Sequence, residues 1–219
     1  MVRLTGYEYS VYTRAVRMAL VARGLAHDYR EADPFDAVQA HALRDLHPFG
    51  RVPVLEDGGF RLWETQAILD YVSGLGAGEA LVPRDVRARA RMRQVMGIAD
   101  SYIYWPLVRQ AVSHAIFLSA RDADTERAMT IIAAGLSEAP RVMDALDEIA
   151  GEGLVLVPGG LTLADCLLWP MLDYVRMIPE GREVMDAREA LSRWAEAMET
   201  TPAVRATRPD LSQLERSAR

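Results

Sequence analysis

The first third of the chain alternates short apolar runs with amphipathic stretches, a pattern typical of a mixed α/β layer. Residues 35–46 fit either a helix or an irregular turn. The other predicted elements are strands over residues 2–5, 26–31, 52–55 and 60–62 and helices over residues 11–23 and 64–71. The expected order is therefore strand, helix, strand, helix or turn, strand, strand, helix.

Beyond this layer the strand patterns almost disappear, and helical periodicity predicts an all-helical region. Glycines and a proline separate the two regions, so we expect one domain over residues 1–75, a linker over 76–83 and a helical domain over 84–219. The expected helices there span residues 84–117, 124–149 and 184–198, with another starting at residues 161–165 and a loose polar tail after Pro209. Breaks are expected at Pro106 and, less strictly, at Pro140, because an interior proline costs about 3 kcal/mol unless the helix kinks.

The most specific local pattern is a hairpin followed by a helix start. Residues 56–59 read Glu-Asp-Gly-Gly between two apolar runs, and Asp-Gly and Gly-Gly supply the positive φ angles of a tight turn. Pro53 stands at the start of the first of these strands, where an X-Pro bond is a candidate for the cis form. Glu64 and Thr65 precede the next helical run, which leaves free backbone N–H groups beside acceptor side chains. This arrangement is suited to holding an anion or a peptide.

These residues resemble the glutathione-binding half of a cytosolic glutathione transferase. The family has a Val-Pro-x-Leu strand, a glycine-rich hairpin and then Glu-Ser/Thr-x-Ala-Ile, and here Val52 and Pro53 are followed by Glu64 and Thr65. The resemblance implies that Val52 pairs its backbone with the cysteinyl part of glutathione, that Pro53 is cis, and that Glu64 and Thr65 hold the γ-glutamyl end. It also implies a thioredoxin-like α/β N-terminal domain followed by an all-α C-terminal domain.

A second match lies at the start of the predicted core helix. Thr162 and Asp165 fit a capping-box variant, and the family carries the same Ser/Thr-x-x-Asp pattern at this place. A capping role without chemistry is our interpretation of this pair. Cys166 follows in an apolar run, where a small buried side chain is expected rather than a nucleophile.

A hydroxyl at the start of the first helix is the candidate for activating a thiol. The family lowers the pKa of the glutathione thiol, because the thiolate is the nucleophile. Residues 10–16 read Ser-Val-Tyr-Thr-Arg-Ala-Val, similar to the Ser-x-x-x-Arg-x-Val pattern of the serine-type classes. Ser10 is therefore the predicted catalytic and glutathione-binding hydroxyl, with a plain helix cap as the other interpretation. Tyr7 and Tyr9 stay open as alternates, since tyrosine-type classes use a tyrosine near the end of the first strand.

The same resemblance suggests further residues. Arg51 is expected to meet the glycine carboxylate of glutathione, with a plain surface arginine as the alternative. His47 stands where relatives more often have Asn, and we expect it to keep a structural turn role. An apolar electrophile is expected between the first-helix turn and the helix after the linker, although aromatic residues at helical spacing also fit a core. The candidates for this pocket are Tyr7, Tyr12, Tyr104 and Trp105.

The amino-acid composition limits which kinds of binding partner and cellular compartment are expected. The chain has 219 residues, a net charge of −6 and one cysteine. The acidic balance argues against nucleic acid, and the arginine-rich residues 84–93 are interpreted as a solvated helix face. One cysteine excludes an internal disulfide, and the histidines have no partners at metal-ligand spacing, so no metal is expected. Neither a membrane-spanning run nor a signal-peptide pattern is present, which predicts a soluble cytoplasmic protein.

Together these patterns predict a glutathione transferase, in which the thiolate of glutathione attacks a hydrophobic electrophile. Glutathione would be the co-substrate, and the resemblance also implies a homodimer. Two other interpretations remain open at this point. One is a binding or regulatory protein of the same fold with little turnover, and the other is a glutathione-dependent isomerase or dehalogenase.

Overall fold

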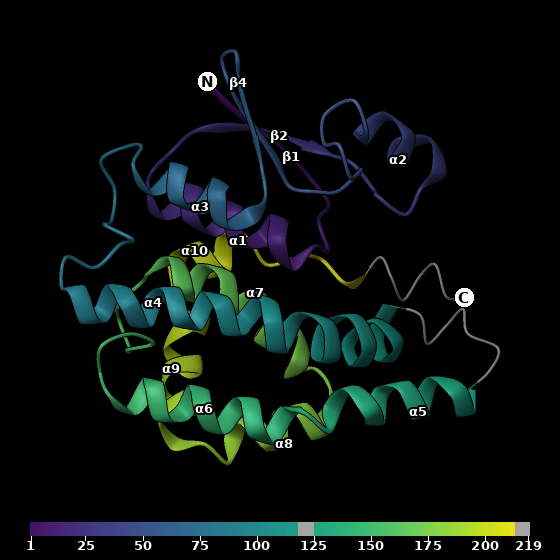
Figure 1. The fold of residues 1–219 in the computed structure, drawn as a ribbon, viewed down its shortest axis with the longest axis vertical. Helices are drawn as coiled ribbons and strands as arrows, with labels where there is room; N and C mark the ends of the chain where they lie inside the picture. The colour runs from purple at the N-terminus through teal and green to yellow at the C-terminus, as the bar shows by residue number, and fades with distance from the viewer. Residues whose placement is uncertain (118–124, 213–219) are drawn as a thin grey trace.

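The computed structural model describes residues 1–117 and 125–212. A four-stranded sheet with the order β2-β1-β3-β4 forms the first layer of the molecule (Figure 1). Its strands are β1 (Val2–Gly6), β2 (His27–Glu31), β3 (Val54–Asp57) and β4 (Phe60–Trp63). β1 runs parallel to β2 and antiparallel to β3, and β3 and β4 form the predicted hairpin. The expected order of elements in this part of the chain is confirmed.

Three helices accompany the sheet: α1 (Val11–Ala22), α2 (Ala37–Leu43) and α3 (Thr65–Ser73). In Figure 1, α1 and α3 lie between the sheet and the helices that follow, whereas α2 lies to one side. One face of α1 is fully buried, with Ala15, Val16 and Ala19 in the core. The start of α1 is thereby held at the junction of the two layers.

The remainder of the described chain is helical. Its elements are α4 (Val86–Ile98), the π-helix η1 (Ala99–Phe117), α5 (Thr125–Leu136), α6 (Ala139–Gly151), α7 (Leu163–Val175), α8 (Pro179–Asp186), α9 (Glu189–Thr200) and α10 (Pro202–Ala206). The molecule is thus a thioredoxin-like α/β domain followed by a helical domain, as the sequence predicts.

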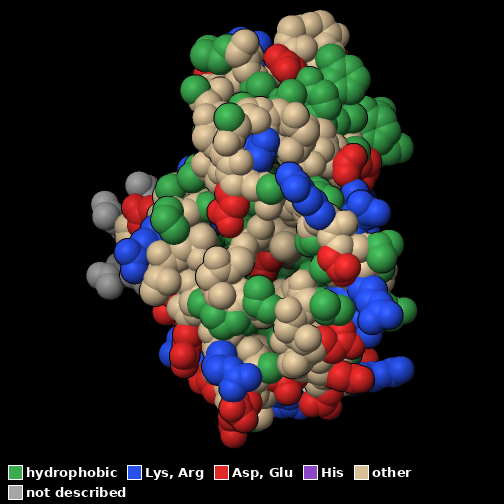
Figure 2. Space-filling model, turned by 90° about the vertical axis from the view of Figure 1, so that its left-hand side faces the viewer, with side chains coloured by type: hydrophobic (Ala, Val, Ile, Leu, Met, Phe, Trp, Pro, Cys, Tyr) green, Lys and Arg blue, Asp and Glu red, His purple; other side chains and the backbone are tan. Residues whose placement is uncertain are grey.

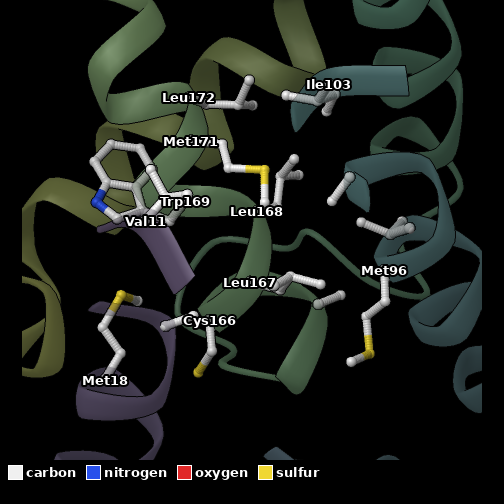
Figure 3. Packing of buried hydrophobic residues seen from close by; sticks show 14 of the residues in the cluster. Val11, Met18, Met96, Ile103, Cys166, Leu167, Leu168, Trp169, Met171 and Leu172 are labelled. Atoms are coloured by element: carbon white, nitrogen blue, oxygen red, sulfur yellow. The ribbon is translucent and has the colours of Figure 1, made fainter. Parts of the chain in front are cut away.

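Helix α7 is the centre of the hydrophobic core. All thirteen of its residues are buried, and Figure 3 shows Trp169 and Met171 pointing from α7 toward other elements of the core. Val11 and Met18 of α1 and Met96 of α4 contribute to the same cluster (Figure 3). Because α7 contacts α1 of the first domain as well as the other helices of its own domain, the position of α1 depends on α7.

The predicted cap of α7 is confirmed. The backbone N–H and the hydroxyl of Thr162 both donate to Oδ2 of Asp165, at 2.7 and 2.5 Å. The other carboxylate oxygen accepts a hydrogen bond from Nε1 of Trp194 at 2.7 Å. Burial is the largest effect on the pKa of Asp165 and raises it, and burial likewise raises the pKa of the Cys166 thiol. Cys166 is buried as expected.

The prediction of a break at Pro106 is wrong. The helix changes to π geometry after Ile98 and continues through Pro106 to Phe117. In the wider π turn, the carbonyl that would clash with the proline ring in an α-helix is displaced. The ring therefore fits without breaking the helix. Helix α5 packs closely against η1 near Pro106. The approach is so close that a side chain in place of Gly135 would collide with the carbonyl oxygen of Pro106.

The possible break at Pro140 is confirmed. The predicted stretch contains two helices, α5 and α6, and Pro140 lies in the first turn of α6, where a missing N–H costs nothing. Two other boundaries differ from the sequence prediction. The predicted helix 184–198 is two helices, α8 and α9, and α10 was not expected. Residues 209–212 are not loose, because Pro209 is buried and the carbonyl of Asp210 accepts a hydrogen bond from Tyr9; the remainder of that tail lies outside the described residues.

The surface of the face shown in Figure 2 carries acidic and basic side chains mixed together over the helical domain. The arginines of residues 84–93 are exposed or half-buried, as expected for a solvated face. Among the described helices, none is long and apolar enough to cross a membrane.

Candidate active site

Ser10 caps the N-terminus of α1. Its Oγ accepts a hydrogen bond from the backbone N–H of Thr13 at 3.2 Å, and its backbone φ and ψ angles are extended. The Thr13 hydroxyl in turn accepts from the backbone N–H of Tyr7 at 3.2 Å, which fixes the turn before the helix. Within residues 1–117 and 125–212, no acceptor takes the hydrogen of the Ser10 hydroxyl. This half-buried hydroxyl can therefore donate to a ligand at the positive end of the helix.

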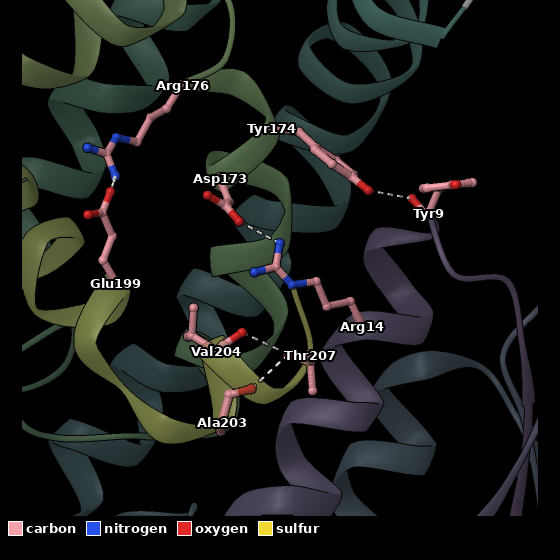
Figure 4. A network of polar contacts seen from close by, with 9 residues as sticks. All are labelled: Tyr9, Arg14, Asp173, Tyr174, Arg176, Glu199, Ala203, Val204 and Thr207. Carbon is pink, nitrogen blue, oxygen red and sulfur yellow. Dashed lines mark hydrogen bonds and ion pairs between the residues drawn. The ribbon is translucent and has the colours of Figure 1, made fainter. Parts of the chain in front are cut away.

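The alternate Tyr9 is engaged by the C-terminal segment. Its hydroxyl donates to the carbonyl of Asp210 at 3.2 Å, and its own carbonyl accepts from the hydroxyl of Tyr174 at 3.2 Å (Figure 4). Burial, followed by the charge of Glu8, raises the pKa of Tyr9. Tyr7 packs its ring at 81° to that of Tyr9, with the centroids 5.4 Å apart. The Tyr9 hydroxyl thus has an acceptor in Asp210, whereas the hydrogen of the Ser10 hydroxyl has none among the described residues.

The loop before β3 brings together the next group of predicted residues. The Val52–Pro53 peptide bond is cis, as predicted. Pro53 is buried, Val52 is partly buried and Arg51 is exposed. The exposed side chain of Arg51 leaves its guanidinium available to a ligand beside the strand start.

His47 is part of the same loop and is buried. Its Nδ1 accepts a hydrogen bond from the backbone N–H of Phe49 at 3.1 Å, and its ring packs on Trp63. Burial lowers the pKa of His47, and the charges of Glu64 and Arg51 act on it more weakly in opposite directions. His47 thus holds the turn, as expected, and lies within electrostatic reach of both charged candidates.

Glu64 and Thr65 stand at the N-terminus of α3. Glu64 has φ 70° and ψ 115°, a strained conformation for a residue other than glycine, and its side chain makes no capping hydrogen bond. Its carboxylate is exposed, whereas Thr65 is 9% exposed. The first N–H groups of a helix lack intrahelical partners, so the start of α3 presents donors beside this carboxylate. Such a mixed set suits a zwitterionic α-amino acid end.

A hydrogen-bonded bridge that the sequence did not predict connects this corner to η1. Asp100 accepts from the hydroxyl of Tyr12 at 3.0 Å and from Nε2 of Gln66 at 2.6 Å. Burial and the Asp100 charge raise the pKa of Tyr12, so its hydroxyl stays protonated and is committed to this bond. The three residues lie on three different helices, and no sequence periodicity connects them. The bridge could therefore be found only from the packing of these helices.

The predicted pocket aromatics do not all come together. Tyr104 packs on Tyr12 with the ring centroids 4.7 Å apart, next to the bridge. Trp105 is 63% exposed and Tyr102 is 61% exposed, so neither belongs to the core. Two rings that no sequence pattern indicated extend the aromatic set: Phe117 packs on Tyr9, and Phe35 packs on Tyr7.

One turn beyond Ser10, Arg14 is buried and reaches the helical domain. Its Nη1 lies 2.6 Å from Oδ2 of Asp173 on α7 (Figure 4). Its Nε and Nη2 atoms are buried and have no hydrogen-bond partner in the described part of the chain. The ion pair fixes α1, and hence Ser10, relative to α7. Among the described residues, no group of three or more His, Cys, Asp or Glu side chains could hold a metal ion.

Comparison with protein families places this geometry in context. The model of the glutathione S-transferase N-terminal domain matches residues 4–79, and that of the C-terminal domain matches residues 129–197. A glutathione S-transferase of Pseudomonas putida is 31% identical over 186 residues, covering 84% of this chain and 79% of the relative. A glutathione S-transferase of Arabidopsis thaliana is 24% identical over 208 residues, covering 93% and 97%.

Solved structures share the fold. A glutathione transferase from Populus trichocarpa superposes with a TM-score of 0.81 at 20% identity, covering 94% of this chain and 97% of that one. The theta class glutathione S-transferase from Xanthomonas axonopodis pv. citri, solved with glutathione bound, gives a TM-score of 0.76 at 23% identity, covering 96% and 99%. With a thioredoxin-like layer, a helical domain and matches to both family models, this chain belongs to the glutathione S-transferase family.

Proposed function

We propose that Ser10 activates the glutathione thiol in this protein. The family relationship makes the chain a glutathione transferase with glutathione as co-substrate, and the proposal concerns how its residues carry the reaction. The observation that supports it most directly is the Ser10 hydroxyl, which accepts from the Thr13 N–H and keeps its own hydrogen for a ligand. No finding favours a binder without turnover, an isomerase or a dehalogenase.

In this mechanism the Ser10 O–H donates a hydrogen bond to the glutathione sulfur and stabilises the thiolate over the thiol. A free thiol has a pKa of about 8.5, and each unit of lowering corresponds to about 1.36 kcal/mol. A charge-assisted hydrogen bond and the N-terminus of α1 together suffice for one to two units. The released proton goes to solvent.

The remaining glutathione contacts follow from charge and position. Glu64 would accept hydrogen bonds from the α-ammonium of the γ-glutamyl group, while Thr65 and the free N–H groups of α3 would donate to its carboxylate. The backbone of Val52, before the cis Pro53, would pair with the cysteinyl residue. Arg51 would form a charge-assisted pair with the glycine carboxylate. For the electrophile we propose contacts with Tyr7, Tyr12, Tyr104 and Trp105.

The test is calorimetric titration of the purified protein with glutathione, followed by a spectrophotometric conjugation assay with 1-chloro-2,4-dinitrobenzene. Binding with release of chloride supports the proposal. Binding without turnover of this and other aryl halides would favour a binding protein. Absence of binding would restrict Glu64, Thr65 and Val52 to structural roles.

We further propose a homodimer, with residues 76–83 as the boundary between the two domains of each chain. Large apolar side chains remain exposed on both domains, among them Phe49, Phe60 and Tyr102, and Figure 2 shows hydrophobic side chains gathered at one edge of the first domain. Burying them against a second copy would remove apolar surface from water. Sedimentation equilibrium should give twice the monomer mass.

We propose the cytoplasm as the compartment, because thiols are kept reduced there.

A further inference from the structure

One face of η1 is directed at the candidate active site. Asp100 bonds Tyr12 and Gln66, Tyr104 packs on Tyr12, and Phe117 packs on Tyr9. These contacts recur along η1 at intervals close to one π turn. Arg109 occupies the middle of this face.

Arg109 contacts the first domain through a ring rather than through a carboxylate. Its guanidinium carbon lies 5.6 Å from the centroid of Phe35, which is 67% exposed. Phe35 packs on Tyr7, with the centroids 5.8 Å apart and the rings at 70°. Arg109 is half-buried, and no carboxylate in residues 1–117 or 125–212 forms an ion pair with it. A planar cation without an ion-pair partner among the described residues therefore lies beside a row of aromatic rings near Ser10.

The charges around this row are unevenly placed. Glu8, Asp210 and Glu31 lie close enough to Tyr9 for their charges to raise its pKa. Arg109 stands at the other end of the row, beside Phe35. An aromatic molecule with an acidic group would avoid the Tyr9 end and turn that group toward the guanidinium, whose fork of N–H donors matches a carboxylate.

We infer that the electrophile is an aromatic compound bearing a carboxylate, with its ring on Tyr7 and Phe35 and its carboxylate on Arg109. This inference rests on the proposed function and names its second substrate class. For an aryl halide, the glutathione thiolate sulfur forms a bond to the ring carbon that carries the halogen. The carbon–halogen bond breaks, and the halide leaves with the electron pair. Arg109 determines specificity, because it binds a group remote from the reacting carbon.

The test compares 4-chloro-3-nitrobenzoate with its methyl ester, which has the same ring, nitro group and leaving group but no charge. We would measure kcat/KM for both in the wild type and in Arg109→Gln, Arg109→Lys and Arg141→Gln. Arg141 is an exposed residue of α6. Helix α6 lies away from the sheet of the first domain in Figure 1, so this variant controls for overall charge. The intrinsic reactivities of the two halides cancel when the acid-to-ester ratio is compared between variants.

Arg109→Gln should lower the acid-to-ester ratio about tenfold or more, as expected for loss of a charge-assisted hydrogen bond. Arg109→Lys should fall between it and the wild type, and Arg141→Gln should keep the wild-type ratio. A parallel calorimetric titration with the two glutathione conjugates should show the same preference in Kd, even where turnover is slow.

An unchanged ratio and unchanged conjugate affinities in Arg109→Gln would overturn the inference while leaving the proposed function standing. A higher KM for glutathione, with the acid-to-ester ratio unaltered, would also overturn it, because Arg109 would then serve glutathione itself. If the wild type neither binds glutathione nor converts either halide, the proposed function fails and the inference fails with it.

Discussion

The guanidinium of Arg14 and the carboxylate of Asp173 meet 2.6 Å apart, with 1% and 9% of their side chains exposed. The pair joins the first helix of the α/β domain to the central helix of the helical domain. Asp173→Asn should lower the free energy of unfolding by about 3–5 kcal/mol, because it leaves a buried cation without its counter-ion. Urea denaturation measures this loss.

The exposed pair of Arg193 and Glu189 on α9 is the matched control. Glu189→Gln should leave the urea midpoint unchanged, because solvent screens this pair. Equal effects of the two substitutions would contradict a structural role for the buried pair.

Ser10→Ala should lower kcat for conjugation roughly tenfold or more, as expected for one to two units of lost thiol acidification. It should also cost about 1 kcal/mol of stability, because the Oγ that accepts the Thr13 N–H is lost. The pH dependence of kcat/KM would shift toward alkaline pH in the variant.

Ser10→Thr keeps both the hydroxyl and the cap and serves as the control. If Tyr7→Phe or Tyr9→Phe abolishes activity while Ser10→Ala retains it, the activating hydroxyl is a tyrosine.

Glu64→Gln should weaken glutathione binding about tenfold or more, since a charge-assisted contact with the α-ammonium is replaced by a neutral one. The urea midpoint should not change, because the Glu64 side chain is exposed and makes no capping bond. Calorimetric titration gives the affinity. Glutamine and glutamate both have a Cβ atom, so the positive φ angle at position 64 is equally strained in the wild type and the variant. Equal Kd values would remove the carboxylate from the glutathione site.

His47 should make the stability depend on pH. Its pKa is lowered by burial, and its Nδ1 must be unprotonated to accept the Phe49 N–H. The unfolded chain therefore binds a proton at a higher pH, near the ordinary value of about 6.5, than the folded protein does. The stabilisation is complete above that value and is lost as pH falls through the lower pKa of the folded state.

Thermal unfolding of the wild type between pH 7.5 and 5 should therefore show a falling Tm. His47→Asn supplies an uncharged acceptor for the Phe49 N–H, and its Tm should decline less over the same interval. Parallel curves for the two proteins would assign the pH dependence to other groups.

Local sequence patterns predicted much of the fold. They predicted the order of elements in the α/β layer, the hairpin turn and the caps at Ser10 and at Thr162, because each of these features depends on residues within a few positions of one another. Boundaries in the helical domain were less readable. Pro106 is accommodated by a π-helix, and the junctions on either side of α8 depend on how helices pack rather than on propensity.

The sequence by itself determined the α/β layer and the helical character of the remainder, because short-range hydrogen bonding and periodicity encode these features. The residues of the candidate glutathione site were predicted from the resemblance of their motifs to those of the family. Only the tertiary structure showed that the Tyr9 hydroxyl donates to Asp210 and the Tyr12 hydroxyl to Asp100. It alone placed Arg109 beside Phe35. These partners lie on different elements and far apart in the chain, and their meeting is set by the packing of whole helices.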